Sequence, residues 1–283
     1  MAGTPTLEEA RQWFAEELRA IGHLTDERVI GAFATIPRER FAGPGPWRLF
    51  HFVDGYWSTP DDDPRRLYHN VLIGLDEARG INIGEPVLWA RHFDRVGIKQ
   101  GDRVLQLGTG TGYYTAILAE LVGPGGRVDG IEIEASLAAA AQRNLAPWPN
   151  ARVRQGDATQ PIDGAWDLVV AFAGATTPLG WWVDALAQGG RLLLPMTGAR
   201  SRGGFMLRLD RQRAGVAAGS VGWVAFYPCA GARSAGDEAA INAATSDPIG
   251  QQAVRSLRRD RHDRDDTCWL HGEGWCLSKH ELH

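Results

Sequence analysis

Apolar and polar residues alternate along the middle of the chain in the manner of strands that take turns with helices. Between residues 101 and 196 the successive segments are RVLQL, YYTAILAELV, RVDGI, ASLAAAAQRNL, ARVRQ, WDLVVAF and RLLLPM. Short apolar runs separated by helical patterns are typical of a parallel sheet with helices on both faces. Residues 205–210 and 223–227 indicate two further strands without a clear helix between them. We therefore expect an α/β fold with a doubly wound, mostly parallel sheet and an antiparallel final hairpin.

The hundred residues before this core predict helices and an aromatic insert. Thr6 and Glu9 have the spacing of a capping box, and apolar residues then recur on one helical face. Further helices are expected over residues 26–35 and 86–96, the latter opened by a proline. Residues 43–70 are rich in glycine, proline, aspartate and aromatic residues, so we expect a loop with short strands that faces the substrate.

Composition and charge argue against several classes of protein. The chain has 283 residues and a formal net charge of −4, which disfavours a general affinity for nucleic acid. No run approaches the roughly 20 apolar residues that span a bilayer. The polar, acidic start does not resemble a secretion signal, so we expect a cytoplasmic protein without a membrane partner. The three cysteines are expected to be reduced thiols, and the oligomeric state is not indicated.

A glycine-rich loop follows the first strand of the core. The strand RVLQL leads into GTGTG at residues 108–112, and a helix is expected from about Tyr113. Missing Cβ atoms permit a tight turn and the close approach of a ligand, although such turns also use glycine for steric reasons alone. A dinucleotide-binding motif would need its third glycine at Tyr113 or Thr115. The spacing therefore fits a ligand without a diphosphate.

Two acidic residues follow the next two strands. Glu132 ends RVDGI, where its carboxylate could accept hydrogen bonds from both hydroxyls of a ribose or simply begin a helix as a solvent-facing acid. Asp157 follows ARVRQ, where it could accept from an adenine amine or form an Asx turn. Ligands of such sheets bind outside the carboxyl ends of the strands, so we favour a nucleoside pocket without phosphate contacts. S-adenosylmethionine fits such a pocket, since direct transfer of its methyl group requires mainly positioning and exclusion of water.

Longer motifs resemble those of the protein-L-isoaspartate O-methyltransferase family between about residues 26 and 196. They are ERVIGAFATIPRERF, GINIGEP, GDRVLQLGTGTGYYTAILAELVG, GRVDGIEIEASL, QGDATQPIDGAWDLVVAFAGA and LAQGGRLLLPM. The resemblance implies a Rossmann-like class I methyltransferase fold, S-adenosyl-L-methionine as cofactor, and GINIGEP as the edge of the methyl-acceptor site. The expected cofactor contacts are Gln106, Gly108, Thr109, Gly110, Gly112, Glu132, Ile133, Asp157 and Ala158.

Two departures from the family pattern alter the expected substrate. Gln106 stands where the family has an acidic residue just before the glycine loop. Asn82 and Gly84 stand where the family has threonine and serine, so the hydroxyl expected to face the acceptor carboxylate is missing. General isoaspartate repair is therefore disfavoured, and we prefer a particular aspartate of a modified precursor peptide as acceptor. No catalytic residue is assigned, and the acceptor-site candidates are Asn82, Ile83, Gly84, Tyr68, His69 and Asn70.

The chain beyond the core carries a second, weaker chemical signal. Residues 232–256 predict one or two helices, and SLRRDRHDRDD that follows is charged enough to be solvated. Cys268-x-x-His271 and Cys276-x-x-x-His280 have spacings that zinc ligands use. We favour the alternative in which the cysteines pack as apolar residues and the histidines face water, so no metal is assigned.

These observations suggest three parts and one leading function. We expect N-terminal helices and an insert on the acceptor side (1–100), a core that binds S-adenosylmethionine (101–230), and a C-terminal extension (231–283). The leading hypothesis is carboxyl O-methylation of an aspartate or isoaspartate in a peptide or protein, because an ionised carboxylate needs no general base. Two alternatives stay open: N- or O-methylation of a small metabolite or nucleic acid, and a binding protein that has lost catalysis.

Overall fold

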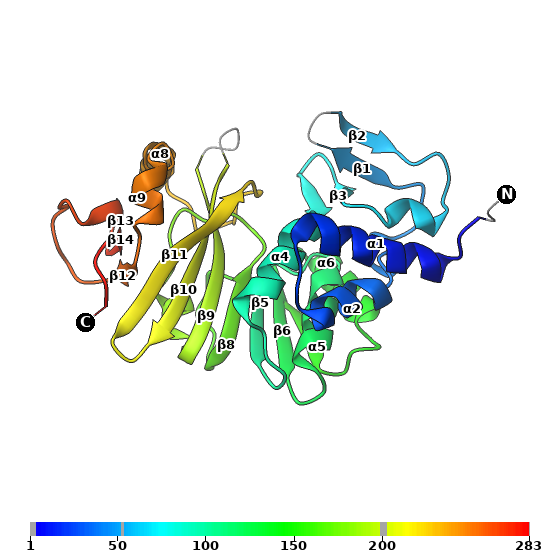
Figure 1. The fold of residues 1–283 in the computed structure, drawn as a ribbon, viewed down its shortest axis with the longest axis horizontal. Coiled ribbons are helices and arrows are strands. Elements are labelled where there is room, and N and C mark those ends of the chain that lie inside the picture. The colour runs from blue at the N-terminus through cyan, green and yellow to red at the C-terminus, as the bar shows by residue number, and fades with distance from the viewer. Residues whose placement is uncertain (1–3, 52–53, 199–202, 283) are drawn as a thin grey trace. The chain divides into compact units, whose positions relative to one another are not determined.

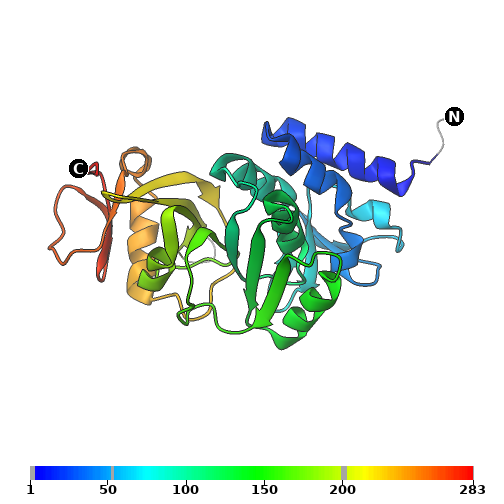
Figure 2. The same cartoon turned by 90° about the horizontal axis from the view of Figure 1, so that it is seen from below.

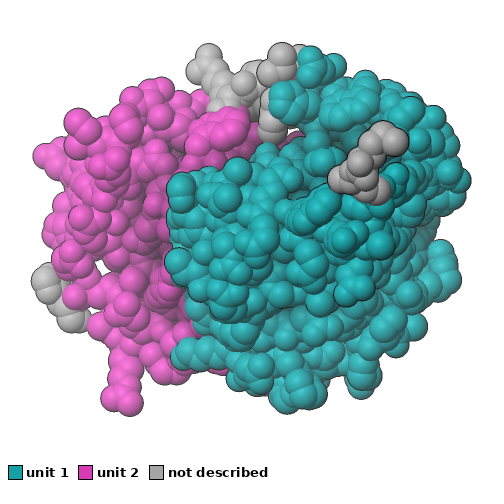
Figure 3. Space-filling view, turned by 45° about the vertical axis from the view of Figure 1, so that its right-hand side comes forward, with its two compact units in different colours: residues 1–102, 109–156 teal, residues 103–108, 157–283 magenta. Residues whose placement is uncertain are grey.

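The structure of the chain is a computed structural model that describes residues 4–51, 54–198 and 203–282 (Figures 1 and 2). The chain divides into two units, which Figure 3 distinguishes by colour. Unit 1 comprises Met1–Asp102 and Thr109–Gly156, and unit 2 comprises Arg103–Gly108 and Asp157–His283. The chain therefore leaves unit 2 within the glycine loop and returns to it directly before Asp157.

The helices of unit 1 start and stop where local sequence signals predict. They are α1 (Leu7–Gly22), α2 (Glu27–Thr35), α3 (Glu39–Ala42), the short 3-10 helix η1 (Pro64–Leu67), α4 (Pro86–Val96), α5 (Tyr113–Val122) and α6 (Ala135–Asn144). The capping box of α1 is confirmed, because the Thr6 hydroxyl accepts from the Glu9 amide at 3.2 Å and the Glu9 carboxylate accepts from the Thr6 amide at 2.7 Å. Burial of Phe14 and Phe33 then holds α1 and α2 together through an edge-to-face ring contact.

The insert of unit 1 is more ordered than its composition suggests. It contributes to a four-stranded antiparallel sheet in the order β2-β1-β3-β4. The strands are β1 (Arg48–His51), β2 (Gly55–Ser58), β3 (Leu72–Asp76) and β4 (Ile81–Ile83). Leu49, Ile73 and Ile83 lie opposite one another on β1, β3 and β4, and all three are buried. This single apolar row holds the sheet together, and it is too short a signal to be recognised along the sequence.

Unit 1 also contains part of the predicted parallel α/β pattern. The strands β6 (Arg127–Glu132) and β7 (Ala151–Gln155) are parallel neighbours, with Val128 opposite Ala151 and Glu132 opposite Gln155. The helix α6 connects them, as expected for a parallel crossover. Glu132 thus lies at the carboxyl end of its strand, where ligands of such sheets bind.

Unit 2 changes from parallel to antiparallel pairing at β9. Its strands are β5 (Arg103–Leu107), β8 (Trp166–Ala171), β9 (Leu186–Thr197), β10 (Gly204–Gln212), β11 (Gly215–Val224), β12 (Ser256–Arg258), β13 (Cys268–Gly272) and β14 (Trp275–Ser278). Within the unit their order is β13-β14-β12-β11-β10-β9-β8-β5, and only β5 with β8 and β8 with β9 are parallel. The α/β class with parallel strands and antiparallel C-terminal strands is confirmed.

Two expectations for the end of the chain are wrong in detail. The second hairpin strand is β11, not residues 223–227, because its GVAAGSVGWV sequence pairs along β10 although it lacks a strong apolar pattern. The hairpin is also not final, since β12 pairs with β11 and buries Ser256 and Leu257 within the supposedly solvated stretch.

The helices of unit 2 are short. They are α7 (Gly180–Asp184), α8 (Ala235–Ala244) and α9 (Pro248–Gln252), and the latter two confirm the helices expected within residues 232–256. The orange helix α8 contacts β9 and β13 of the same unit (Figures 1 and 2). Within the described part of the chain, every helix is too short or too polar to cross a bilayer.

Candidate active site

The glycine loop has the backbone that its sequence predicts. Gly110 and Gly112 have φ angles of +53° and +99°, in the left-handed region that favours glycine. A Cβ atom added to Gly112 would lie 3.2 Å from Leu145 Cγ, whereas one added to Gly110 would meet nothing within 4 Å. Gly112 is therefore required for conformation and for packing against Leu145, and Gly110 for conformation alone.

The Glu132 carboxylate holds this loop from the end of β6. Its Oε2 atom accepts from the Gly110 amide at 2.7 Å, and its Oε1 atom accepts from the Glu134 amide at 3.1 Å. The side chain is 6% exposed, and burial raises the pKa of Glu132 although the amides favour the charged form. A carboxylate offers about four lone-pair sites, more than these amides use, so it can also accept from a diol. Such burial does not fit a merely solvent-facing acid.

Gln106 orders the other end of the loop within unit 2. It is fully buried in β5, and its Nε2 atom donates to the Gly108 carbonyl at 3.3 Å. A carboxylate cannot donate this hydrogen bond. The glutamine therefore supports the loop through a carbonyl, a contact that an acidic residue at this position could not make.

Asp157 forms the Asx turn that its sequence position allows. Its Oδ1 atom accepts from the amide and the hydroxyl of Thr159 at 2.8 and 2.7 Å. The hydrogen bond from the Thr159 amide lowers the pKa of Asp157, which keeps the carboxylate charged. The Oδ2 atom contacts only the Gln160 amide group among the hydrogen bonds of the described residues, at 3.3 Å, so it has capacity for a further donor.

Two tryptophans that the sequence analysis did not assign to the site support this turn. The indole nitrogen of Trp182 donates to the Ala158 carbonyl at 3.0 Å, and that of Trp181 donates to the Thr159 carbonyl at 2.8 Å. Trp182 is fully buried. The pair therefore positions the backbone next to Asp157, and the adjacent tryptophans in PLGWW were the available signal.

In the GINIGEP segment, Gly84 has no hydroxyl and is closely packed by aromatic side chains. The Gly84 carbonyl accepts from the Tyr114 hydroxyl at 2.6 Å. A Cβ atom added to Gly84 would lie 3.2 Å from Nε1 of Trp89, whose side chain is fully buried. Ile83 is also buried, and the Asn82 side chain donates to the Gly80 carbonyl at 3.1 Å. A serine at position 84 would therefore press against a rigid indole.

Asn70 and Glu85 form a small polar cluster beside Gly84. The Asn70 amide nitrogen donates to Glu85 Oε1 at 2.9 Å, while its oxygen accepts from the Val87 amide at 2.8 Å and so caps α4. Burial raises the pKa of Glu85. Glu85 was not predicted as a site residue, although its place between Gly84 and Pro86 was a signal. A buried acid with a raised pKa beside a candidate acceptor loop is a candidate functional group.

Tyr68 and His69 lie in contrasting surroundings. The Tyr68 hydroxyl donates to the Glu39 carboxylate and accepts from Arg11 Nε at 2.9 Å and the Arg38 amide at 3.1 Å. These contacts use the full capacity of a phenolic hydroxyl, and the residue is buried. The geometry of Tyr68 therefore favours a structural role. The His69 side chain is 66% exposed and remains accessible to a ligand.

Comparison with known proteins identifies a family. The family model for protein-L-isoaspartate(D-aspartate) O-methyltransferase matches residues 9–234. Protein-L-isoaspartate O-methyltransferase 2 of an Anaeromyxobacter species is 33% identical over 195 residues, which cover 66% of this chain and 69% of that protein. The protein-L-isoaspartate O-methyltransferase of Gloeobacter violaceus is 31% identical over 217 residues, which cover 75% of this chain and 94% of that protein.

A solved structure supports the fold independently of these sequence matches. A protein-L-isoaspartate O-methyltransferase superposes with a TM-score of 0.66 and 21% identity over 89% of this chain and 72% of that chain. The family match spans more than half of the chain and includes the glycine loop, Glu132, Asp157 and GINIGEP. The chain thus belongs to the protein-L-isoaspartate(D-aspartate) O-methyltransferase family, whose members are S-adenosylmethionine-dependent methyltransferases.

Proposed function

We propose that this chain transfers a methyl group from S-adenosylmethionine to the carboxylate of an aspartate or isoaspartate in a peptide or protein, with a modified precursor peptide as its specialised acceptor. The observation that carries the proposal is the buried Glu132 carboxylate, which holds Gly110 and retains acceptor capacity for a ribose diol. Because the loop that Glu132 holds has no dinucleotide spacing, a nucleoside cofactor suits it better than a dinucleotide.

We assign the cofactor contacts to nine residues at or near strand ends. They are Thr109, Gly110, Gly112, Glu132 and Ile133 in unit 1, and Gln106, Gly108, Asp157 and Ala158 in unit 2. Ile133 supports this assignment because its apolar side chain is 48% exposed directly after Glu132, where it can lie against a base. When bound, the cofactor supplies an electrophilic methyl group on a sulfonium.

The residues of the chain need only bind and orient the reactants for this transfer. An acceptor carboxylate is already ionised at neutral pH, so no general base has to remove a proton from it. The reaction then depends on alignment and on exclusion of water. We assign no metal to this step and no side chain to proton transfer.

The acceptor site supports a peptide that differs from a general isoaspartyl substrate. Gly84 lacks the hydroxyl of the family pattern, and Trp89 packs where a side chain at position 84 would begin. Asn82 lies on β4, which is an edge strand of its four-stranded sheet. An edge strand can pair with an extended peptide through main-chain hydrogen bonds. We therefore propose that Asn82, Ile83, Gly84 and the neighbouring Asn70 and His69 border a peptide acceptor.

A methylation assay with matched peptides tests the proposal. Full-length protein is given S-adenosylmethionine with an isoaspartyl peptide, its aspartyl isomer or its asparaginyl analogue, and the product is treated with mild alkali. We expect methylated product only with the carboxylate peptides and release of its methyl group as methanol. An alkali-stable methyl group would indicate N-methylation instead. Tight binding of S-adenosylhomocysteine without turnover of a broad peptide set, including modified precursors, would indicate a binding protein.

Two predictions from the sequence, the division of the chain into three parts and its cellular location, remain proposals. We expect residues 1–100 to serve the acceptor side, residues 101–230 to bind the cofactor and residues 231–283 to form an extension. We also expect a cytoplasmic protein. Fluorescence microscopy of a tagged chain and limited proteolysis with and without S-adenosylhomocysteine test the location and the division.

A further inference from the structure

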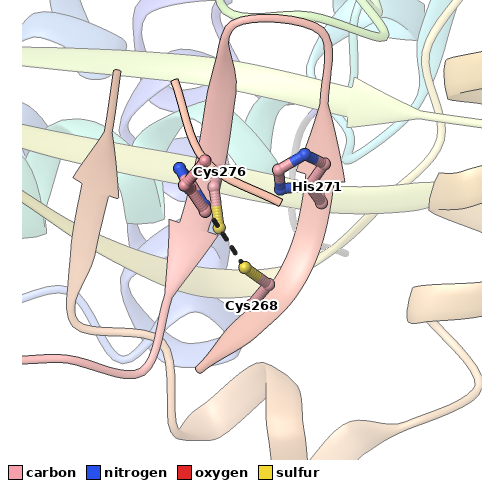
Figure 4. Close-up of side chains that lie close together, drawn as sticks. Cys268, His271 and Cys276 are labelled. Carbon is pink, nitrogen blue, oxygen red and sulfur yellow. Dashed lines mark hydrogen bonds between the residues drawn. The ribbon is translucent and has the colours of Figure 1, made fainter. Parts of the chain in front are cut away.

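The C-terminal extension of unit 2 gathers four metal-binding side chains away from the candidate active-site residues in the sequence. His262, Cys268, His271 and Cys276 each offer one ligand atom, and these atoms all lie within 4.8 Å of one another. Figure 4 shows Cys268 and His271 on β13 and Cys276 on β14, with the two thiols pointing toward each other. The sequence spacing suggested His280 as the fourth residue, but the structure brings in His262 instead.

Strand pairing and a bulge place three of the four side chains on one face. His271 lies directly opposite Cys276 across the β13–β14 hairpin, so their side chains share a face. Residues three apart on a regular strand would face opposite sides, which would separate Cys268 from His271. The register shifts between Cys268 and Leu270, and such a bulge re-aims the side chain that precedes it. The bulge thus lies at the position where it can bring Cys268 to the same face as His271 and Cys276.

His262 reaches the cluster from the loop between β12 and β13 with a defined tautomer. Its Nδ1 atom is 3.0 Å from the Asp260 carbonyl oxygen, which can only accept, so Nδ1 carries the proton. The lone pair is then on Nε2, which lies 3.4 Å from Cys268 Sγ. Metal-binding histidines typically donate their other N–H to a carbonyl or carboxylate in this way.

His271 supplies an independent sign of a missing partner. Its Nδ1 atom is buried and has no hydrogen-bond partner among the residues that the structure describes. A buried polar atom without a partner loses its hydration without compensation, so a native structure rarely leaves one without a reason. Its ring also meets that of His262 edge to face, with the centroids 4.9 Å apart. Two imidazoles and two thiols therefore share a small volume in which one ring nitrogen lacks a partner.

We propose that His262, Cys268, His271 and Cys276 bind one structural zinc ion. With Zn–S and Zn–N bonds of about 2.3 and 2.0 Å, the ligand atoms of a tetrahedral site lie roughly 3.3–3.8 Å apart. The distance of 3.4 Å between His262 and Cys268 falls in this range, and the bound of 4.8 Å for the group requires side-chain movements of only about 1 Å. Four protein ligands leave no open position, so the site is structural and not catalytic.

Charge balance around the cluster is compatible with a zinc dithiolate. Two thiolates neutralise the ion, and Cys268 then gives up the hydrogen bond that its thiol donates to Asp265 Oδ1 at 3.5 Å. That oxygen keeps a partner, because it also accepts from the Thr267 amide at 2.9 Å. Arg258, whose guanidinium lies 3.6 Å from the other oxygen of Asp265, offsets the negative charge nearby.

Zinc would add a further tie to a polar loop that is held by contacts such as the ion pair of Arg259 with Asp184. Residues 259–267 are RDRHDRDDT and contain no apolar side chain, yet the His262 side chain is only 12% exposed. Binding of His262 to the same ion as β13 and β14 closes this loop, and the binding free energy adds to the stability of the extension. Trp269 connects β13 to β10 of the same unit by an edge-to-face contact with Phe205 at 5.1 Å. Removal of zinc is therefore expected to loosen the part of this loop around His262.

Metal analysis of the full-length, tag-free protein tests the proposal. The protein is purified under reducing conditions, its zinc is quantified by mass spectrometry, and the stripped protein is titrated with Co²⁺. We expect one zinc ion per chain, and intense visible bands of tetrahedral cobalt with a thiolate charge-transfer band. A reduced, folded chain that holds no zinc and gives no such bands would overturn the proposal, as would a Cys268–Cys276 disulfide in protein from a reducing cytoplasm.

Matched variants separate zinc binding from folding. His262→Gln removes a ligand from the loop without touching the hairpin. We expect its zinc affinity to fall by roughly 100-fold or more, because even the loss of a residue that only hydrogen-bonds a ligand costs about 10- to 100-fold. His280→Gln and Cys229→Ser change the same residue types outside the group and should retain the wild-type affinity. Unchanged affinity in His262→Gln would refute the assignment. If Cys276→Ser fails to fold, the cobalt titration of the wild-type chain still decides the question, and neither test depends on methyl transfer.

Discussion

Replacing Glu132 by glutamine separates cofactor recognition from loop support. The carboxylate accepts from the Gly110 amide through one oxygen and from the Glu134 amide through the other. Glutamine has the same shape, but one of its ends donates, so one of these amides would face another N–H group. A diol that binds both oxygens would likewise lose one acceptor.

The expected magnitudes follow from these contacts. In the variant, one charge-assisted hydrogen bond to the ribose diol is lost and the other becomes a weaker, neutral one. Together these changes should cost about 2–4 kcal/mol of cofactor binding, or roughly 30- to 700-fold in Kd. Stability of the free protein changes less. One buried amide loses its acceptor, at about 1–3 kcal/mol. The variant, however, no longer buries a charged carboxylate, and it is this burial that raises the pKa of Glu132.

Calorimetry with S-adenosylhomocysteine measures the effect, and thermal unfolding of the free protein reports the loop. Glu134→Gln is the matched control, because the Glu134 side chain pairs with Arg79 at the surface and only its amide contacts Glu132. We expect wild-type affinity in this control. Affinity of Glu132→Gln within twofold of wild type would refute the role of Glu132 in ribose binding, even if the loop were destabilised.

Three further predictions concern the glycines and the buried acid. Gly112→Ala should destabilise the protein by about 2–5 kcal/mol in urea unfolding, because alanine is strained in the left-handed conformation and its Cβ atom overpacks against Leu145. Gly101 has a φ of +86° but open space around it, so Gly101→Ala should cost only about 1–2 kcal/mol. Equal losses in the two variants would show that packing against Leu145 does not contribute. Because the folded-state pKa of Glu85 is raised, its carboxyl binds more protons in the folded than in the unfolded state above pH 4.5, so the contribution of Glu85 to stability should fall as pH rises from there through the folded pKa. Glu85→Gln should remove this contribution, so the Tm of the variant should rise relative to that of the wild type between pH 4 and 8, and parallel curves would contradict the prediction. Gly84→Ser should lower stability by about 1–3 kcal/mol through its contact with Trp89 and bring no gain in isoaspartyl-peptide methylation, whereas methylation above the wild-type level would show that the missing hydroxyl limits activity on that peptide.

Local signals in the sequence identified most of the regular elements. The capping box at Thr6, the proline at the start of α4 and the apolar runs of β5 and β8 each act within a few residues, so they can be recognised along the chain. Strand β11 escaped recognition because glycine, alanine and serine dominate it, and its position depends on pairing with β10. Short strands were expected in the insert, but their pairing with β3 and β4 in one sheet was not, because it depends on contacts between segments that are distant in the sequence.

In the candidate site, too, contacts between residues that are distant in the sequence were not predicted. The glycine loop and Glu132 were recognisable because their spacing relative to the strands is local. The contacts that support the residues of the site could not be recognised from the sequence. Asn70 caps a helix 17 residues further along the chain, and Trp182 donates to a carbonyl 24 residues before it. Neither contact leaves a periodic trace in the sequence.

Sequence alone therefore determined the α/β class, the family and the cofactor, since each rests on short motifs whose residues are neighbours along the chain. Tertiary structure decided which distant residues meet. It set Trp89 against Gly84, buried Tyr68 in the N-terminal helices, and replaced His280 by His262 beside the two cysteines. The physical reason is that side-chain direction on a strand depends on register and bulges, and a shift of one residue turns a side chain to the opposite face.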